Sequence, residues 1–337
     1  MIKRWVERSP FWAFYWIAIS IPVILFSYLI ILEVYYQSVN GADFSFFSNV
    51  FSIRDQLASR YPVLFHNGDS VVLYLSWYVI MPLGLPMICF PLAPTLAALT
   101  VTAVSRGREG LKFLLSLYKP VRGNLSLRNG VKIYLTMLTF LVAMISLACL
   151  REYFWGEPER VSAALNQIGF IDWKILSVTL FMALFFNQGG LLEELGWRGY
   201  ALPLMIERWG SPLLATLLLG VAWALWHLPR EIPTLLSGQI DVLNLLSQQG
   251  WFILLCCSMS VIATYFVNIT GGSVLPAIMI HGVLNLVGGM FGRDQVGVRG
   301  VFTQDVPLMW MCAALVLLLV VGKDLGWQRR KSILGQG

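Results

Sequence analysis

The chain has 337 residues, of which 57% are hydrophobic and only 12% charged, and its mean hydropathy is +0.70. An ordinary soluble domain is about 25% charged and about 45–50% apolar. The composition therefore excludes a soluble globular protein, a disordered chain and a collagen-like fibre. We expect an all-α membrane protein that crosses the bilayer several times.

The net charge of +6 comes from basic residues that lie between apolar runs. In that position they can anchor spans to an anionic cytoplasmic leaflet, so we expect membrane lipids and no nucleic acid as partners. The five cysteines lie inside apolar runs, are odd in number and form no C-x-x-C pair, which argues against a disulfide framework or a thiolate zinc site. They are Cys89, Cys149, Cys256, Cys257 and Cys312.

Eight apolar stretches meet or approach the roughly 20 helical residues that a bilayer core requires. In chain order they are 11–32, 71–104, 131–150, 175–192, 212–228, 251–267, 273–290 and 307–321. The first is too long for the apolar region of a cleaved signal, about 7–15 residues, and no small-residue cleavage site follows it. We therefore expect it to be a retained span.

The second stretch is overlong and carries four prolines. We expect one kinked span there, with two short re-entrant pieces as the alternative. A cytoplasmic N-terminus and eight crossings then place 16 of the 24 basic residues inside, as the positive-inside rule requires. Both termini are thus expected in the cytoplasm, at the plasma membrane of a prokaryote. We expect a polar outer segment over 35–70, with Asp43, Asp55 and Asp69, and a short interfacial helix over 111–118.

No internal repeat, low-complexity tract or long linker divides the chain, so we expect one domain over 1–337, whose N-terminal spans and loops occupy 11–150.

Ionisable groups in hydrocarbon cost about 2.5–3.5 kcal/mol each and persist where they are paired or line a wet cavity. The few in this chain gather in three places. They are Glu193, Glu194 and Arg198 after the fourth stretch, His227 in the fifth, and His281 with Asn285 in the seventh.

Helical spacing assigns these side chains to faces. Glu194 and Arg198 are four residues apart and can form an ion pair, whereas Glu193 is rotated by about 100° and can point elsewhere. Trp223 shares a face with His227, and His281 with Asn285. If the three faces meet, they form a polar cavity between spans four, five and seven that can activate a water and stabilise an oxyanion.

Each feature also has a structural interpretation. Glu194 and Arg198 can be a purely structural pair, His227 can hydrogen-bond a carbonyl near a span end, and Asn285 can serve a helix contact. The coincidence of all three groups in one membrane domain is what favours catalysis.

The three motifs resemble those of the CAAX protease and bacteriocin-processing family, which includes the type II CAAX prenyl endopeptidases. Glu193, Glu194 and Arg198 match E-E-x-x-x-R, His227 matches F-x-x-x-H with Trp223 in place of Phe, and His281 with Asn285 matches H-x-x-x-N. The resemblance covers about 175–290, the expected catalytic core. The Phe-to-Trp departure falls at a position expected to serve packing, where it would alter pocket shape rather than chemistry.

The resemblance implies an intramembrane endopeptidase acting on a membrane-associated or lipidated peptide or protein. It assigns water activation to Glu193 and His227, oxyanion stabilisation to His281 and Asn285, and a supporting role to Glu194 and Arg198. A metal-free, glutamate-type site is expected, since the chain has no H-E-x-x-H helix; the alternative is zinc held by Glu193, His227 and His281.

Two other functions stay open. One is a non-catalytic immunity or scaffold protein of the same fold, although such a protein would be free to lose Glu193 or His281. The other is a proton-coupled transporter. The chain has no inverted repeat, the usual internal signature of such transporters, which argues against this function.

One difficulty concerns depth: the span count puts Glu193 near the cytoplasmic end of its helix and His227 near the far end of the next. Breaks at Gly189, Gly190, Pro203 or Pro229, or an opening at Pro276, could bring the two together.

Overall fold

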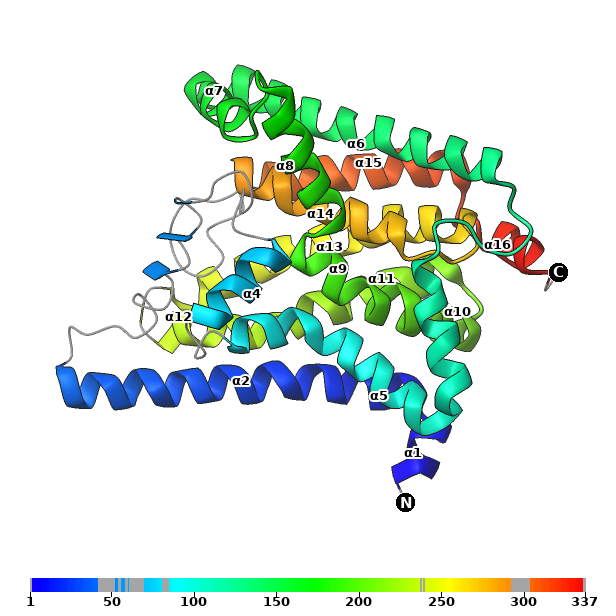
Figure 1. Cartoon of the computed structure of the whole chain (residues 1–337), viewed down its shortest axis with the longest axis horizontal. Coiled ribbons are helices and arrows are strands. Elements are labelled where there is room, and N and C mark those ends of the chain that lie inside the picture. The colour runs from blue at the N-terminus through cyan, green and yellow to red at the C-terminus, as the bar shows by residue number, and fades with distance from the viewer. Residues whose placement is uncertain are drawn as a thin grey trace.

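The computed structural model describes residues 2–41, 70–80, 85–236, 240–291 and 304–335, together with positions 52, 53, 56, 57, 60 and 238. These residues form an all-α protein; its one β contact among them is an isolated bridge between Ser70 and Asn187. Most of the long helices run roughly side by side, and both termini lie at the same end of the bundle (Figure 1). The acidic residues of the expected outer segment, Asp43, Asp55 and Asp69, lie outside the described residues.

Five helical segments in the described part of the chain are long and apolar enough to cross a membrane, and four shorter apolar helices accompany them. The five are Pro10–Asn40, Ile88–Tyr118, Leu127–Trp155, Pro212–Leu236 and Val242–Ile269. The four shorter ones are Val71–Ile80, Trp173–Phe185, Leu275–Phe291 and Asp305–Val321. Each of the eight expected stretches thus contains helix, but two of them are built differently from the expectation.

The second stretch holds one described helix on each side of residues 81–84, which lie outside the described part of the chain, and the second helix runs on past the end of the stretch. The stretch holds a ten-residue helix, α4 (Val71–Ile80), and the start of α5 (Leu85–Leu115), which packs along α2 (Pro10–Asn40). Helix α5 continues into the segment expected as an interfacial helix, after a kink at Gly107, whose φ of 59° suits a residue without a Cβ. The chain changes direction there (Figure 1). The short helix α1 (Ile2–Arg8) precedes α2 and also contacts α5.

The fourth stretch breaks inside the apolar run. After α6 (Leu127–Trp155) and the polar α7 (Pro158–Gln167), helix α8 (Trp173–Phe185) ends after 13 residues. A new helix begins at Gln188, since the Asn187 side chain accepts a hydrogen bond from the Gly190 backbone N–H and caps it. It runs through α9 (Gln188–Glu194), a π-helical turn (Leu195–Ala201) and α10 (Leu202–Trp209). Glu193 is therefore the sixth residue of a new helix that continues beyond it. This corrects the expectation that Glu193 lies near the cytoplasmic end of the helix formed by the fourth stretch.

The C-terminal half surrounds a central helix. The central helix is α13 (Val242–Ile269), which packs against α11 (Pro212–Trp226), α14 (Leu275–Phe291) and α15 (Asp305–Val321). After α11 the chain passes through a 3₁₀ turn (Leu228–Glu231) into α12 (Ile232–Leu236). The apolar window of α13 is 78% buried, the highest share among the five long helices. The chain ends in α16 (Trp327–Leu334), which also contacts α13.

Candidate active site

A helix break with a side-chain cap positions the acidic motif. The Asn187 Oδ1 atom accepts from the Gly190 N–H and from Asn285 Nδ2 on α14, each at 3.0 Å. The Asn187 cap therefore connects the start of α9 to the helix that carries Asn285. Irregular backbone at membrane depth is tolerated where it is buried in protein, and both Asn187 and Gly190 are buried.

Glu194 is the centre of a buried ionic network. Its Oε1 atom accepts from Arg198 Nη1 at 2.9 Å and from His281 Nδ1 at 2.8 Å, which confirms the expected pairing of Glu194 with Arg198. The Oε2 atom of Glu194 is sealed from solvent without a hydrogen-bond partner. Because a carboxylate can only accept, Nδ1 of His281 carries a proton, and the ring is held in one orientation.

Arg198 ties this network to helix α13. Its Nη2 atom donates to Ser260 Oγ at 2.7 Å and contacts Met259 Sδ at 3.3 Å, and its guanidinium carbon lies 4.6 Å from the centre of the Trp223 ring. Arg198 is completely buried, as is Glu194. It lies within the π-helical turn, a feature that often marks functional sites.

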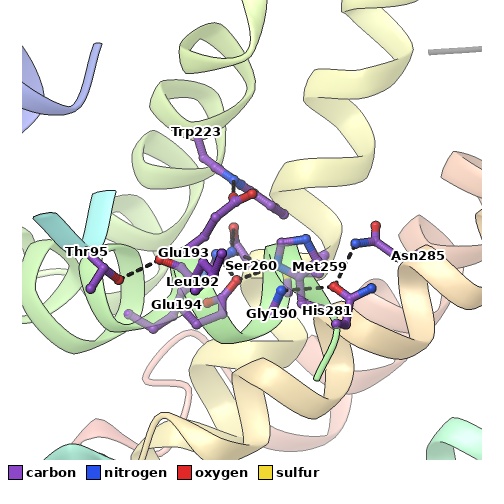
Figure 2. A network of polar contacts seen from close by, with 12 residues as sticks. Thr95, Gly190, Leu192, Glu193, Glu194, Trp223, Met259, Ser260, His281 and Asn285 are labelled. Atoms are coloured by element: carbon purple, nitrogen blue, oxygen red, sulfur yellow. Dashed lines mark hydrogen bonds and ion pairs between the residues drawn. The ribbon is translucent and has the colours of Figure 1, made fainter. Parts of the chain in front are cut away.

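Glu193 has a different environment. Its Oε2 atom accepts a hydrogen bond from the Trp223 indole N–H at 2.7 Å, and its side chain points toward Trp223 (Figure 2). Its Oε1 atom has no hydrogen-bond partner within the described residues, yet it is not sealed from solvent as Glu194 Oε2 is. The side chain is only 3% exposed. Glu193 is thus a deeply placed carboxylate with one oxygen open.

Trp223 links Glu193 to His227. While its indole bonds Glu193, its backbone carbonyl lies 2.9 Å from His227 Nδ1. A carbonyl can only accept, so Nδ1 of His227 donates and Nε2 is the acceptor nitrogen of the neutral ring. The expectation that Trp223 serves packing is therefore incomplete. The indole N–H, which a Phe would lack, donates a hydrogen bond to Glu193.

His281 and Asn285 meet the start of α9 at a glycine. A Cβ on Gly189 would lie 2.6 Å from His281 Nε2 and 3.1 Å from Asn285 Nδ2. These two nitrogens therefore face the same point of backbone, four residues before Glu193. Like Glu193 Oε1, His281 Nε2 makes no hydrogen bond in the described part of the chain and is not sealed from solvent.

The structure thus brings five of the six predicted residues together where α9 meets α14, packs Arg198 against α13, and links His227 to them through Trp223. Sequence reasoning missed Asn187 and Ser260, considered Gly189 only as a helix break, and expected Trp223 to serve packing alone. An Asn two residues before a Gly-Gly pair is a cap signal that could have been used. Ser260 has no local signal, because only the crossing of α13 brings it to Arg198.

The glycines and prolines that could have opened a helix do not mark the break. Pro276 is the second residue of α14, where proline suits a helix start, so it does not open that helix. The break instead lies at Phe186 and Asn187, before Gly189 and Gly190 rather than at them. Pro229 lies in the 3₁₀ turn after His227, and Pro203 lies in the first turn of α10.

The zinc alternative would use Glu193, His227 and His281 as ligands. In the part of the chain that the structure describes, no three His, Cys, Asp or Glu side chains come close enough together to hold a metal ion. The Nδ1 atoms of His281 and His227 contact Glu194 and the Trp223 carbonyl, and Glu193 Oε2 accepts from the indole, so a metal would be reached only through the Nε2 atoms and Glu193 Oε1. None of the described cysteines forms a disulfide.

Fold and site together define a multi-pass, all-α membrane protein with a buried cluster of Glu, His, Arg and Asn side chains. Residues 174–287 match the model of the family described as type II CAAX prenyl endopeptidase Rce1-like. The chain is also 28% identical over 244 residues to the CAAX prenyl protease 2 of Methanococcus maripaludis, which covers 67% of this chain and 83% of that protein. Over residues 174–287 the chain is thus similar to the Rce1-like family.

Proposed function

We propose that this protein is an intramembrane endopeptidase that uses Glu193 and His227 to activate a water. The observation that carries the proposal is the Oε1 atom of Glu193, which makes no hydrogen bond within the described residues although Glu193 is only 3% exposed. An unpaired buried carboxylate is costly and is retained where it has a chemical task.

The proposed reaction divides the work among four side chains. A water held by Glu193 Oε1 and the acceptor nitrogen of His227 would lose a proton to one of them as it attacks the scissile carbonyl. The carbonyl oxygen, now negative, would accept hydrogen bonds from the amide of Asn285 and from His281 Nε2. His281 can donate from Nε2 as an imidazolium, whose charge the Glu194 carboxylate at 2.8 Å stabilises. The proton taken from the water would then pass to the amine nitrogen as the C–N bond breaks, releasing the amine and the new carboxylate.

The substrate we propose is a membrane-associated peptide with a prenylated cysteine near its C-terminus. The family match and the archaeal relative, which is described as a CAAX prenyl protease, support this class of substrate. We propose a metal-free reaction, in which Glu193 and His227 act on the water directly. We also propose that the end bearing both termini faces the cytoplasm, since the basic residues concentrate there.

The test uses purified full-length protein and a panel of farnesylated peptides that end in Cys-aliphatic-aliphatic-X, with the unprenylated peptides as controls. Products are identified by mass spectrometry for the wild type and for His227→Gln. We expect release of the last three residues by the wild type and a loss of about 10²–10⁴-fold in the variant. No product from any peptide, or equal product from a well-folded His227→Gln protein, would favour a binding protein of the same fold.

A further inference from the structure

Two arginines at the end of the bundle that carries both termini lie against one backbone turn. The turn is Gly271–Gly272, which joins α13 to α14, and both glycines have positive φ angles. Arg122 comes from the loop between α5 and α6, and Arg330 comes from α16. Neither belongs to the candidate active site.

Arg330 is buried with little to balance its charge. Its side chain is among the buried charged groups, with the residue only 6% exposed. Its Nη1 atom donates to Asn268 Oδ1 at 3.3 Å, and its guanidinium lies 5.0 Å from the centre of the Trp327 ring. A Cβ on Gly272 would be 2.8 Å from the guanidinium carbon, so only glycine allows this close approach.

Arg122 approaches the neighbouring residue of the same turn. Its Nη1 atom donates to the Gly271 carbonyl at 3.2 Å, its Nη2 atom donates to Ser116 Oγ at 3.4 Å, and the group lies 5.2 Å from the Phe113 ring. Consecutive Cα atoms are about 3.8 Å apart, so the two guanidinium groups contact adjacent points of backbone. Two like charges are therefore held close together.

All the hydrogen-bond acceptors of these arginines are neutral. Within the described residues, no carboxylate lies within ion-pair distance of either one. Burial lowers the pKa of Arg330 to about 10; the positive charge of Arg122 lowers it as well, and only Glu207 opposes them. Burial also lowers the pKa of Arg122. A buried guanidinium next to a half-buried one of the same sign is unfavourable unless an anion joins them.

We propose that Arg122 and Arg330 bind a phosphate group, which either a lipid headgroup or a soluble phosphate compound can supply. The Nε and Nη2 atoms of Arg330 make no hydrogen bond within the described residues and are not sealed from solvent. A guanidinium presents paired N–H donors that match phosphate oxygens, and the basic end of the bundle attracts anions. Because α14 begins at Leu275, an occupied site would also brace the helix that carries His281.

A simpler role for Arg330 is to dock α16 onto α13 through Asn268. The test therefore rests on Arg122→Gln, which leaves that contact in place. Arg128→Gln is the matched control, because Arg128 is exposed and lies six residues further along at the start of α6. Full-length protein in neutral detergent is titrated with sodium phosphate at constant ionic strength, and the shift in its unfolding midpoint is measured. A second arm compares nanodiscs of phosphatidylcholine with and without phosphatidylglycerol.

We expect a saturable rise in the unfolding midpoint in at least one arm. The apparent affinity should fall at least tenfold in Arg122→Gln and less than twofold in Arg128→Gln. A response to inorganic phosphate identifies a soluble ligand, whereas a response only to phosphatidylglycerol identifies a lipid headgroup. No saturable shift in either arm, or equal shifts in the two variants, would overturn the proposal in favour of simple docking. Because the readout is binding, its failure would leave the proposed protease activity untouched.

Discussion

The carboxylate of Glu194 is surrounded by an arginine and a histidine, whereas that of the preceding Glu193 bonds one neutral indole and keeps an oxygen open. The two residues are adjacent in the chain but point to different sides of α9, one toward α13 and α14 and the other toward α11. A buried ion pair has its charges compensated, while an open carboxylate beside an imidazole can exchange protons. We therefore propose that Glu194 holds the neighbouring side chains in place, whereas Glu193 acts on the water.

The largest expected effect comes from breaking the Glu194 side. Arg198→Met removes one partner of a completely buried pair and leaves the Glu194 charge facing an apolar side chain. Such a loss destabilises a protein by about 3–5 kcal/mol. We expect a much lower unfolding midpoint in detergent and little protein in the membrane fraction. A variant as stable as the wild type would mean that the network contributes little to the fold.

A smaller effect should follow from Trp223→Phe on the Glu193 side. The change removes the N–H that bonds Glu193 but keeps an aromatic ring beside Arg198 and His281, and it restores the residue of the family motif. A hydrogen bond to a charged group is worth about 1.5–3 kcal/mol. We expect slower cleavage of a prenylated peptide and a moderate fall in the unfolding midpoint, smaller than that of Arg198→Met. A large loss of stability instead would assign Trp223 to packing alone.

Gly189→Ala tests the close contact between the start of α9 and the His281 and Asn285 side chains. The added methyl group would lie 2.6 Å from His281 Nε2, so the ring must move away from its place. Overpacking of this kind costs about 1–3 kcal/mol. We expect reduced cleavage and a lower unfolding midpoint. Gly250→Ala is the control, because no atom lies within 4 Å of a Cβ on that helical glycine. Equal behaviour of the two variants would contradict the close contact.

The smallest expected effect is that of metal removal. If the carboxylates act as described, incubation with a zinc chelator followed by gel filtration should leave the cleavage rate unchanged. The measurement is the initial rate before and after chelation, with zinc added back in a parallel sample. A rate that falls on chelation and returns with zinc would require a metal at Glu193, His227 and His281 and would remove the distinction between the two carboxylates.

Local spacing was enough to predict part of this site. The pairing of Glu194 with Arg198 and the different direction of Glu193 follow from 3.6 residues per helical turn. The placement of His281 with Asn285 on one face follows in the same way. These features depend on one helix at a time, and a single sequence carries that information.

The remaining features depend on how helices cross. The Trp223–Glu193 hydrogen bond joins residues 30 positions apart, and the Arg198–Ser260 bond joins residues 62 positions apart. The break at Asn187 was also hard to predict, because the apolar run continues through Phe185 and Phe186 without a change in composition. Hydropathy alone extends the span there, while the Asn187 cap and its bond to Asn285 end it.

The most direct test of the division between the two carboxylates compares Glu193→Gln with Glu194→Gln in one preparation. Each variant is assayed for cleavage of a farnesylated peptide and for thermal unfolding in the same detergent. We predict that Glu193→Gln unfolds like the wild type, since the amide oxygen can still accept from Trp223, but forms no product. We predict that Glu194→Gln unfolds at a clearly lower temperature. A Glu193→Gln protein that cleaves the peptide at the wild-type rate would contradict the account.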